Sequence, residues 1–324
     1  MFYNSSMKYF MKNNFRHFNA KTTLDAAQEY CNQLKMGNSM LISLAGAMST
    51  GEIGITLSKM IEKDKVHAIC CTGANLEEEI FYLIAKKSYK VIKNWRNLTL
   101  QEESDLAEKN LNRVTDTCIP ETAINILKNI ILNYWIKADK NKKSYAPYEY
   151  IYQIIESGIL NKYYDGNEKE SWVIAACKKK IPIFTPGWED STLGNIFIAN
   201  NILGNISNLS IVKSGLHQMK DLIKWYVLTT KNKNIGFFQI GGGIAGDYAI
   251  SAVPLIKQDL GWDVPLWSYF CQISDSTTSY GSYSGAFPSE KITWGKIGMK
   301  TPQYIIESDA SIVAPLIFSY ILNI

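Results

Sequence analysis

The stretch Ile235-Gly-Phe-Phe-Gln-Ile-Gly-Gly-Gly-Ile-Ala-Gly246 decides the fold of this 324-residue chain. Its first half, 235–240, is apolar and short, which predicts a buried strand. The glycines of 241–246 follow with G-x-G-x-x-G spacing, before a helical pattern over 248–260. An acid, Asp263, lies about twenty residues further on, where such motifs carry one. A turn without side chains lets backbone N–H groups and a helix N-terminus approach a pyrophosphate. Taken alone, the pattern is also typical of an ordinary tight strand–helix turn.

The same alternation of short apolar runs and helical patterns continues along the chain. Strands are predicted at 40–44, 66–71, 181–185, 235–240, 266–273 and 303–306. Helices are predicted at 23–34, 54–63, 76–87, 119–138, 148–159, 191–202, 212–230 and 248–260. This order predicts a mostly parallel sheet with helices on both faces. We expect one large Rossmann-like α/β domain over 41–324, after a helical lead-in over 1–40.

The segment 86–150 is more polar than the rest and contains the Lys-rich stretch 137–143. We expect a helical excursion on the rim of the sheet here, not a separate domain. A charge run of this kind is usually a solvated face.

Composition excludes several function classes. The net charge is only +4, and Arg16, Arg96 and Arg113 are the only arginines among 34 basic residues, so nucleic acid is not an expected partner. Six cysteines without Cys-x-x-Cys spacing and three scattered histidines predict neither a metal site nor disulfides, as in a reducing cytoplasm. No run reaches the roughly 18 apolar residues of a membrane helix.

Small and hydroxylic residues fill the segments that follow the predicted strands: 45–49, 72–75, 185–190, 241–243 and 274–279. In a parallel sheet, ligands gather beyond the carboxyl ends of the strands. We therefore expect these segments to line one crevice that suits a large cofactor. Gly, Ser and Thr also fill loops that bind nothing, so the pattern alone leaves this open.

A lysine near the C-terminus is the candidate nucleophile. Lys296 ends the stretch Ser282-Tyr-Ser-Gly-Ala-Phe-Pro-Ser-Glu-Lys-Ile-Thr-Trp-Gly-Lys296, and Ile297 follows it. A lysine attacks only as a neutral amine, which requires desolvation or a nearby positive charge. Without further context, a solvated surface lysine is the more common case.

Six blocks, in this order, resemble the deoxyhypusine synthase family. They are Leu44-Ala-Gly-Ala-Met-Ser-Thr50, Cys71-Thr-Gly-Ala-Asn-Leu-Glu-Glu78, Asp190-Ser-Thr-Leu-Gly-Asn195, Gly241-Gly-Gly243, the Trp294-Gly-Lys-Ile297 segment and Ser308-Asp-Ala-Ser311. The resemblance implies NAD as cofactor, contacted by Ser49, Thr72, Gly73, Ala74, Glu78, Asp190, Gly242, Gly243, Asp309 and Ala310. It also implies that Glu290 and Trp294 hold a polyamine and that Lys296 forms a covalent imine.

The implied activity is an NAD-dependent aminobutyl transfer from a polyamine such as spermidine. The implied acceptor is a lysine of a small translation factor, which becomes deoxyhypusine, the precursor of hypusine. The implied assembly is a homotetramer with active sites between subunits. Two alternatives stay open: a homospermidine synthase-like enzyme with a free diamine acceptor, and a non-catalytic NAD-binding homologue.

Three departures from the family pattern affect the substrate side. Asn195 and Tyr283 replace two acids, and Asp247-Tyr248 replaces a pair of histidines. Each lost charge-assisted hydrogen bond is worth about 1.5–3 kcal/mol, so spermidine cannot be held in the same way. Asp247, or Glu189, is a candidate replacement for the base or for the ammonium anchor. We therefore expect an altered donor or acceptor.

Overall fold

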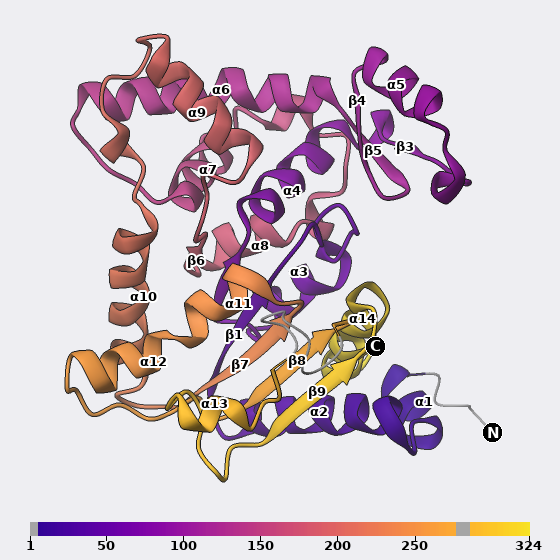
Figure 1. Cartoon of the computed structure of the whole chain (residues 1–324), viewed down its shortest axis with the longest axis vertical. Coiled ribbons are helices and arrows are strands. Elements are labelled where there is room, and N and C mark those ends of the chain that lie inside the picture. Colours follow the sequence, from indigo (N-terminus) through magenta and orange to yellow (C-terminus); the bar gives the residue numbers. More distant parts are fainter. Residues whose placement is uncertain (1–5, 277–285) are drawn as a thin grey trace.

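The computed structural model describes residues 6–276 and 286–324, and a parallel sheet lies at its centre (Figure 1). Within these residues six strands pair in the order β6-β2-β1-β7-β8-β9, and every pairing is parallel. The strands are β1 (Ser39–Leu44), β2 (Ala68–Cys71), β6 (Ile183–Phe184), β7 (Ile235–Ile240), β8 (Phe270–Ser274) and β9 (Gln303–Glu307). All six predicted strands are confirmed, with shifted ends.

Counted along the chain, these strands stand in the order 3-2-1-4-5-6. This is the order of doubly wound dinucleotide-binding folds. The direction of winding reverses between β1 and β7, so their carboxyl ends lie side by side. The predicted Rossmann-like architecture is confirmed.

Both faces of the sheet are buried, which explains the nearly continuous apolar strands. Successive residues belong to different cores: Leu41 and Phe237 pack on one face, Ile42 and Phe238 on the other. The first face is covered by α10 (Gly215–Thr229), α11 (Gly243–Ile250) and α12 (Ala252–Pro254). The second is covered by α2 (Phe18–Lys35), α3 (Gly54–Glu62), α8 (Trp172–Lys179) and α14 (Ala310–Leu322).

The remaining elements lie around this sandwich. A helix, α1 (Met7–Asn14), packs against α14, and α13 (Glu290–Thr293) precedes β9. The helix α4 (Gly73–Ala85) packs against two further helices, α6 (Glu121–Lys140) and α9 (Thr192–Ile202), and α7 (Pro147–Glu156) packs against α6. These three helices lie in the upper part of Figure 1. No helix of the described residues has the length and apolar character needed to cross a bilayer.

The expectation of a purely helical excursion over 86–150 is wrong. Besides α5 (Leu100–Glu108) and α6, it forms a small antiparallel sheet of β3 (Lys90–Val91), β4 (Leu111–Val114) and β5 (Thr117–Pro120). β4 and β5 form a hairpin whose turn places Thr115 at φ +52°. The turn contains no glycine, so the sequence lacked the usual hairpin signal. A salt bridge between Arg113 and Glu103 joins the hairpin to α5.

One boundary matters for the site. The helix predicted over 248–260 begins at Gly243, is interrupted at Ser251 and ends in a π-helical turn, Leu255–Asp259. The helix therefore starts inside the glycine turn, and Asp247 lies on it rather than before it. α8 and α14 were not predicted at all; Pro315 within α14 disguises that helix.

Candidate active site

The glycine turn after β7 has the geometry that phosphate-binding turns require. Gly241 has φ +77°, and a Cβ there would lie 2.8 Å from the Cβ of Ala45, in the loop after β1. Gly243 has φ +64° and no heavy atom within 4 Å of such a Cβ, so its backbone is open to a ligand. A Cβ on Gly246 would lie 2.6 Å from the side chain of Gln239, so this glycine permits close helix–strand packing. The three glycines thus meet the three demands of the motif.

The loops after β1 and β2 are fixed by one buried amide. The side chain of Asn75 accepts from the backbone N of Ser49 (2.9 Å) and donates to the carbonyl of Gly46 (2.9 Å). The Ser49 hydroxyl donates to the carbonyl of Asn75 (2.7 Å) and accepts from Nε1 of Trp172 (2.9 Å). Thr72 Oγ1 donates to the carbonyl of Gly46 (2.9 Å). The hydroxyls of Ser49 and Thr72 therefore shape the loop that a cofactor would meet.

Three consecutive glutamates on α4 are buried, each for a different reason. Glu77 accepts from the backbone N–H groups at the start of α9, and burial raises its pKa to about 7. Glu79 accepts from the backbone N of Trp172 at the start of α8 (2.8 Å), and burial raises its pKa to about 8. Glu78, predicted to contact the cofactor, accepts from Thr50 Oγ1 (2.7 Å), and burial raises its pKa. It also lines a cavity between α4, α6 and α9.

The other predicted cofactor residues lie at the carboxyl edge. Gly73 and Ala74 begin α4 directly after β2, and Asp190 is an exposed residue of the segment between β6 and α9. Asp309 and Ala310 begin α14 after β9, where Oδ1 of Asp309 accepts from the backbone N of Ser311 (2.7 Å). Asp263, in contrast, precedes β8 at the amino edge and forms a salt bridge with Lys257. It is therefore not the acid that the glycine motif calls for.

The candidate nucleophile is buried beside a carboxylate. Lys296 is 8% exposed, and its Nζ lies 3.0 Å from Oδ1 of Asp247 on α11. The backbone of Lys296 is held at the amino edge, where its carbonyl accepts from the backbone N of Trp267 (3.3 Å), just before β8. Figure 1 shows α13, the helix that precedes Lys296, near the tails of the strands. The lysine side chain thus reaches along the α11 face of the sheet.

Lys296 and Asp247 line a cavity together with Glu290, Lys291 and Trp294, which we call the lysine cavity. Glu290 begins α13, and its Oε1 accepts from the backbone N of Phe287 (3.0 Å). The ring of Trp294 lies 5.9 Å from Nζ of Lys296, and 68% of this side chain is exposed. An indole face at this distance is within cation–π range.

The structure separates the other predicted substrate residues from this cavity. Asn195 and Glu189 line a second cavity, beside the start of α10, which we call the β6 cavity. Nδ2 of Asn195 donates to the carbonyl of Ser191 within its own helix (2.8 Å). Tyr283 lies outside the described residues.

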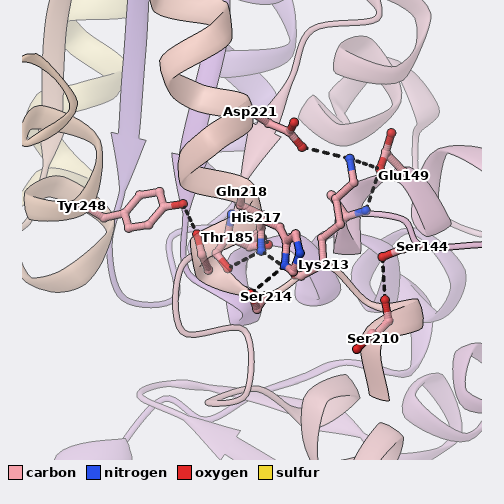
Figure 2. A network of polar contacts seen from close by, with 12 residues as sticks. Ser144, Glu149, Thr185, Ser210, Lys213, Ser214, His217, Gln218, Asp221 and Tyr248 are labelled. Carbon is pink, nitrogen blue, oxygen red and sulfur yellow. Dashed lines mark hydrogen bonds and ion pairs between the residues drawn. The ribbon is translucent and has the colours of Figure 1, made fainter. Parts of the chain in front are cut away.

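Tyr248, at the second position of the replaced histidine pair, points towards the start of α10 (Figure 2). Its hydroxyl donates to the carbonyl of Gly215 at the start of α10 (2.6 Å). There Gln218 accepts from the backbone N of Thr185 (2.8 Å), and Lys213 bridges Asp221 and Glu149. This polar network fixes α10 against β6 and α11.

Sequence reasoning missed Lys291, Asn75 and Gln239. Lys291 is buried in the lysine cavity, Asn75 organises two cofactor loops, and Gln239 packs under Gly246. Asn75 lay within a block that had been singled out, and Gln239 was the polar residue of a strand otherwise apolar. Lys291 had no distinguishing signal.

Strand order and glycine turn define a Rossmann-type α/β protein, here with a buried lysine on the α11 face. The chain belongs to the deoxyhypusine synthase family, whose model matches residues 10–321.

Named relatives agree with this assignment. "Probable deoxyhypusine synthase 2" of Methanosarcina mazei is 24% identical over 301 residues, covering 93% of this chain and 81% of that protein. The "Deoxyhypusine synthase-like protein" of Chlorobaculum parvum is 26% identical over 285 residues, covering 87% and 76%. A crystal structure from Entamoeba histolytica that carries the deoxyhypusine synthase name matches with a TM-score of 0.58 at 14% identity, covering 96% of this chain and 90% of that one. The last comparison supports the fold alone.

Proposed function

We propose that this protein is an NAD-dependent aminoalkyl transferase whose covalent nucleophile is Lys296. One observation carries the proposal: Lys296 is buried and its Nζ lies 3.0 Å from Asp247, on the helix that the glycine turn opens. Burial is the condition under which a lysine becomes a nucleophile. Family membership supplies the reaction class, because deoxyhypusine synthases transfer an aminobutyl group with NAD.

The residues at the carboxyl edge fit NAD. The open backbone of Gly243, directly after Gly242, and the N-terminus of α4, at Gly73 and Ala74, suit the pyrophosphate. The exposed carboxylate of Asp190 suits ribose hydroxyls, as does that of Asp309. NAD, when bound, would supply the redox chemistry: it would accept a hydride from the carbon next to a secondary amine and return it to the imine formed with the acceptor.

The chain's own residues perform the transfer. Lys296, whose Nζ lies beside the carboxylate of Asp247, must first lose a proton, because an ammonium does not attack. The neutral amine then bonds to the imine carbon of the substrate, and the original C–N bond breaks as the leaving amine takes a proton. Lys296 carries the alkyl fragment until an acceptor amine displaces it. Asp247 fixes the position of Nζ throughout.

The donor is a polyamine in this proposal. Glu290 offers a carboxylate and Trp294 an aromatic face to its ammonium groups, and both line the lysine cavity. Position 195 is an amide and position 283 a phenol, so two anchoring charges of the family are missing. This favours, as a second candidate, a homospermidine synthase-like reaction, in which a free diamine rather than a lysine of a small translation factor accepts the fragment.

The exposed ring of Trp294 beside a buried nucleophile is what a site completed by a second subunit requires. We therefore extend the proposal to a homotetramer with active sites between subunits, in the cytoplasm. Size-exclusion chromatography with light scattering tests the assembly directly.

The decisive experiment traps the covalent intermediate. Protein, NAD and isotopically labelled spermidine, homospermidine or putrescine are incubated, reduced with borohydride and digested for mass spectrometry. We expect an NAD-dependent label on Lys296 and none in Lys296→Arg. Lys300→Met, which removes an exposed lysine of the same segment, is the matched control and should label normally.

The outcomes separate the candidates. Label followed by transfer to a translation-factor lysine supports the namesake reaction, whereas transfer only to diamines supports the second candidate. NAD binding without any adduct, across all three amines, would indicate a non-catalytic NAD-binding homologue.

A further inference from the structure

Lys291 is a buried amine that the proposed chemistry has not yet used. It is 5% exposed, and its Nζ lies 4.7 Å from the ring centroid of Phe270, the first residue of β8. It lines the lysine cavity together with Lys296. Among the residues that the structure describes, no carboxylate forms an ion pair with it. A lysine is almost never buried without a charged partner, so this position calls for a functional explanation.

The surroundings of Lys291 disfavour its charged form. Burial and, after it, the neighbouring charge of Lys296 together lower its pKa to about 8. Glu290, on its own helix, and Asp247, on α11, act weakly in the opposite sense. Asp259 of the π-helical turn lines the same cavity, and β8 contributes only the ring of Phe270. Lys291 therefore loses its proton at a lower pH than an unperturbed lysine does.

The proposed reaction needs a group that can accept a proton from the substrate. A secondary amine is protonated near pH 7, and it must lose this proton before a hydride can leave the adjacent carbon. Both residues of the replaced histidine pair are already engaged. Asp247 already accepts from Lys296, and Tyr248 donates to the carbonyl of Gly215 outside the cavity.

We propose that Lys291 is the general base of the lysine cavity. Its neutral amine takes a proton from the substrate's secondary ammonium: one N–H bond breaks on the substrate and one forms on Nζ. The resulting Lys291 ammonium later returns a proton to the departing amine, so the group is regenerated. A lysine tuned to a pKa of 7–8 by burial is suited to this exchange. This role rests on the function proposed above.

Three variants test the role. Lys291→Met removes the amine with little change in shape, Lys291→Arg keeps a charge that cannot be given up, and Lys300→Met is the control. The rate of Lys296 adduct formation is measured between pH 6 and 10. In the wild type we expect it to rise with a midpoint near 8, set by Lys291. The variants Lys291→Met and Lys291→Arg should lower the rate of adduct formation at pH 8 about 100-fold and remove this midpoint. Both should retain NAD binding and the melting temperature of the wild type.

A second measurement needs no turnover. Trace acetylation of all lysines in the native protein, at a series of pH values, gives the titration of each amine by mass spectrometry. We expect Lys291 to titrate near 8, and the exposed Lys300 serves as the comparison in the same digest.

The outcomes distinguish the two proposals. Full activity of Lys291→Arg, or titration of Lys291 near 10.5, overturns its role as a base while leaving the transferase reaction intact. Absence of any Lys296 adduct in the wild type refutes the transferase, and the base role with it, even if Lys291 titrates near 8.

Discussion

Replacing Glu79 with Gln should remove much of the pH dependence of stability. Glu79 is 5% exposed, and burial raises its pKa from 4.5 to about 8. An acid with a raised pKa in the folded state stabilises that state fully below its unfolded pKa, and this contribution is lost as the pH rises through the folded pKa. Between pH 5.5 and 7.5 the loss from Glu79 is about 2.5 kcal/mol, and between pH 7 and 8 about 1 kcal/mol.

Glu77 also loses its stabilising contribution as the pH rises, but its pKa is only about 7. The change in stability between pH 7 and 8 therefore reports mainly on Glu79. A glutamine at position 79 can still accept from the backbone N of Trp172 and takes up no proton. Urea unfolding followed by circular dichroism at half-unit pH steps gives the free energy of unfolding for wild type, Glu79→Gln and the exposed control Glu62→Gln. Equal slopes for wild type and Glu79→Gln would refute the reasoning.

Three further changes have definite expected outcomes. Gly246→Ala forces Gln239 to move: overpacking costs about 1–3 kcal/mol, offset by up to about 1 from helix propensity, so urea unfolding should show a net loss of about 1–2 kcal/mol. Asp247→Asn should cost no more than about 1 kcal/mol, because the pair is partly exposed, yet reduce the Lys296 adduct at least about tenfold in the trapping assay. Tyr248→Phe should lose about 1 kcal/mol of stability, seen as a lower melting temperature, with adduct formation retained.

Gly215→Ala is the matched control for the glycine change. It lies at the start of α10 with no heavy atom within 4 Å of the added Cβ, so it should be neutral or slightly stabilising. An unchanged free energy of unfolding in Gly246→Ala would mean that the side chain of Gln239 can move aside without destabilising the fold. An unchanged adduct in Asp247→Asn would show that the carboxylate does not position Lys296.

The features that could be predicted from the sequence are those with a recognisable pattern over a few consecutive residues. The six strands were recognisable because strands buried on both faces read as continuous apolar runs, and the glycine turn because its spacing reports close backbone approach. Lys296 and Asp247 were both singled out, and the structure brings them together although 49 positions separate them.

The missed features depend on contacts between distant segments. Glu77, Glu78 and Glu79 would normally lie on a surface, and their burial follows from backbone N–H groups and a hydroxyl supplied by other elements. Lys291 is buried because β8 and the π-helical turn enclose it, which no spacing within its own segment reveals. Asp263 satisfied the spacing of the ribose acid, but the chain reaches it before β8 begins, at the wrong edge of the sheet.

The backbone of Lys296 and the glycine turn lie at opposite edges of the sheet, and this determines how far the Lys296 amine lies from the turn. Asp247 lies four residues beyond Gly243 along α11, which corresponds to about 6 Å of helix. For a dinucleotide whose phosphates lay on the turn, the Lys296 amine would therefore be about one helical turn further along α11. Inserting or deleting one residue of α11 between Gly243 and Asp247 would rotate Asp247 by about 100° around the helix axis relative to the turn. Its contact with Lys296 would then be lost.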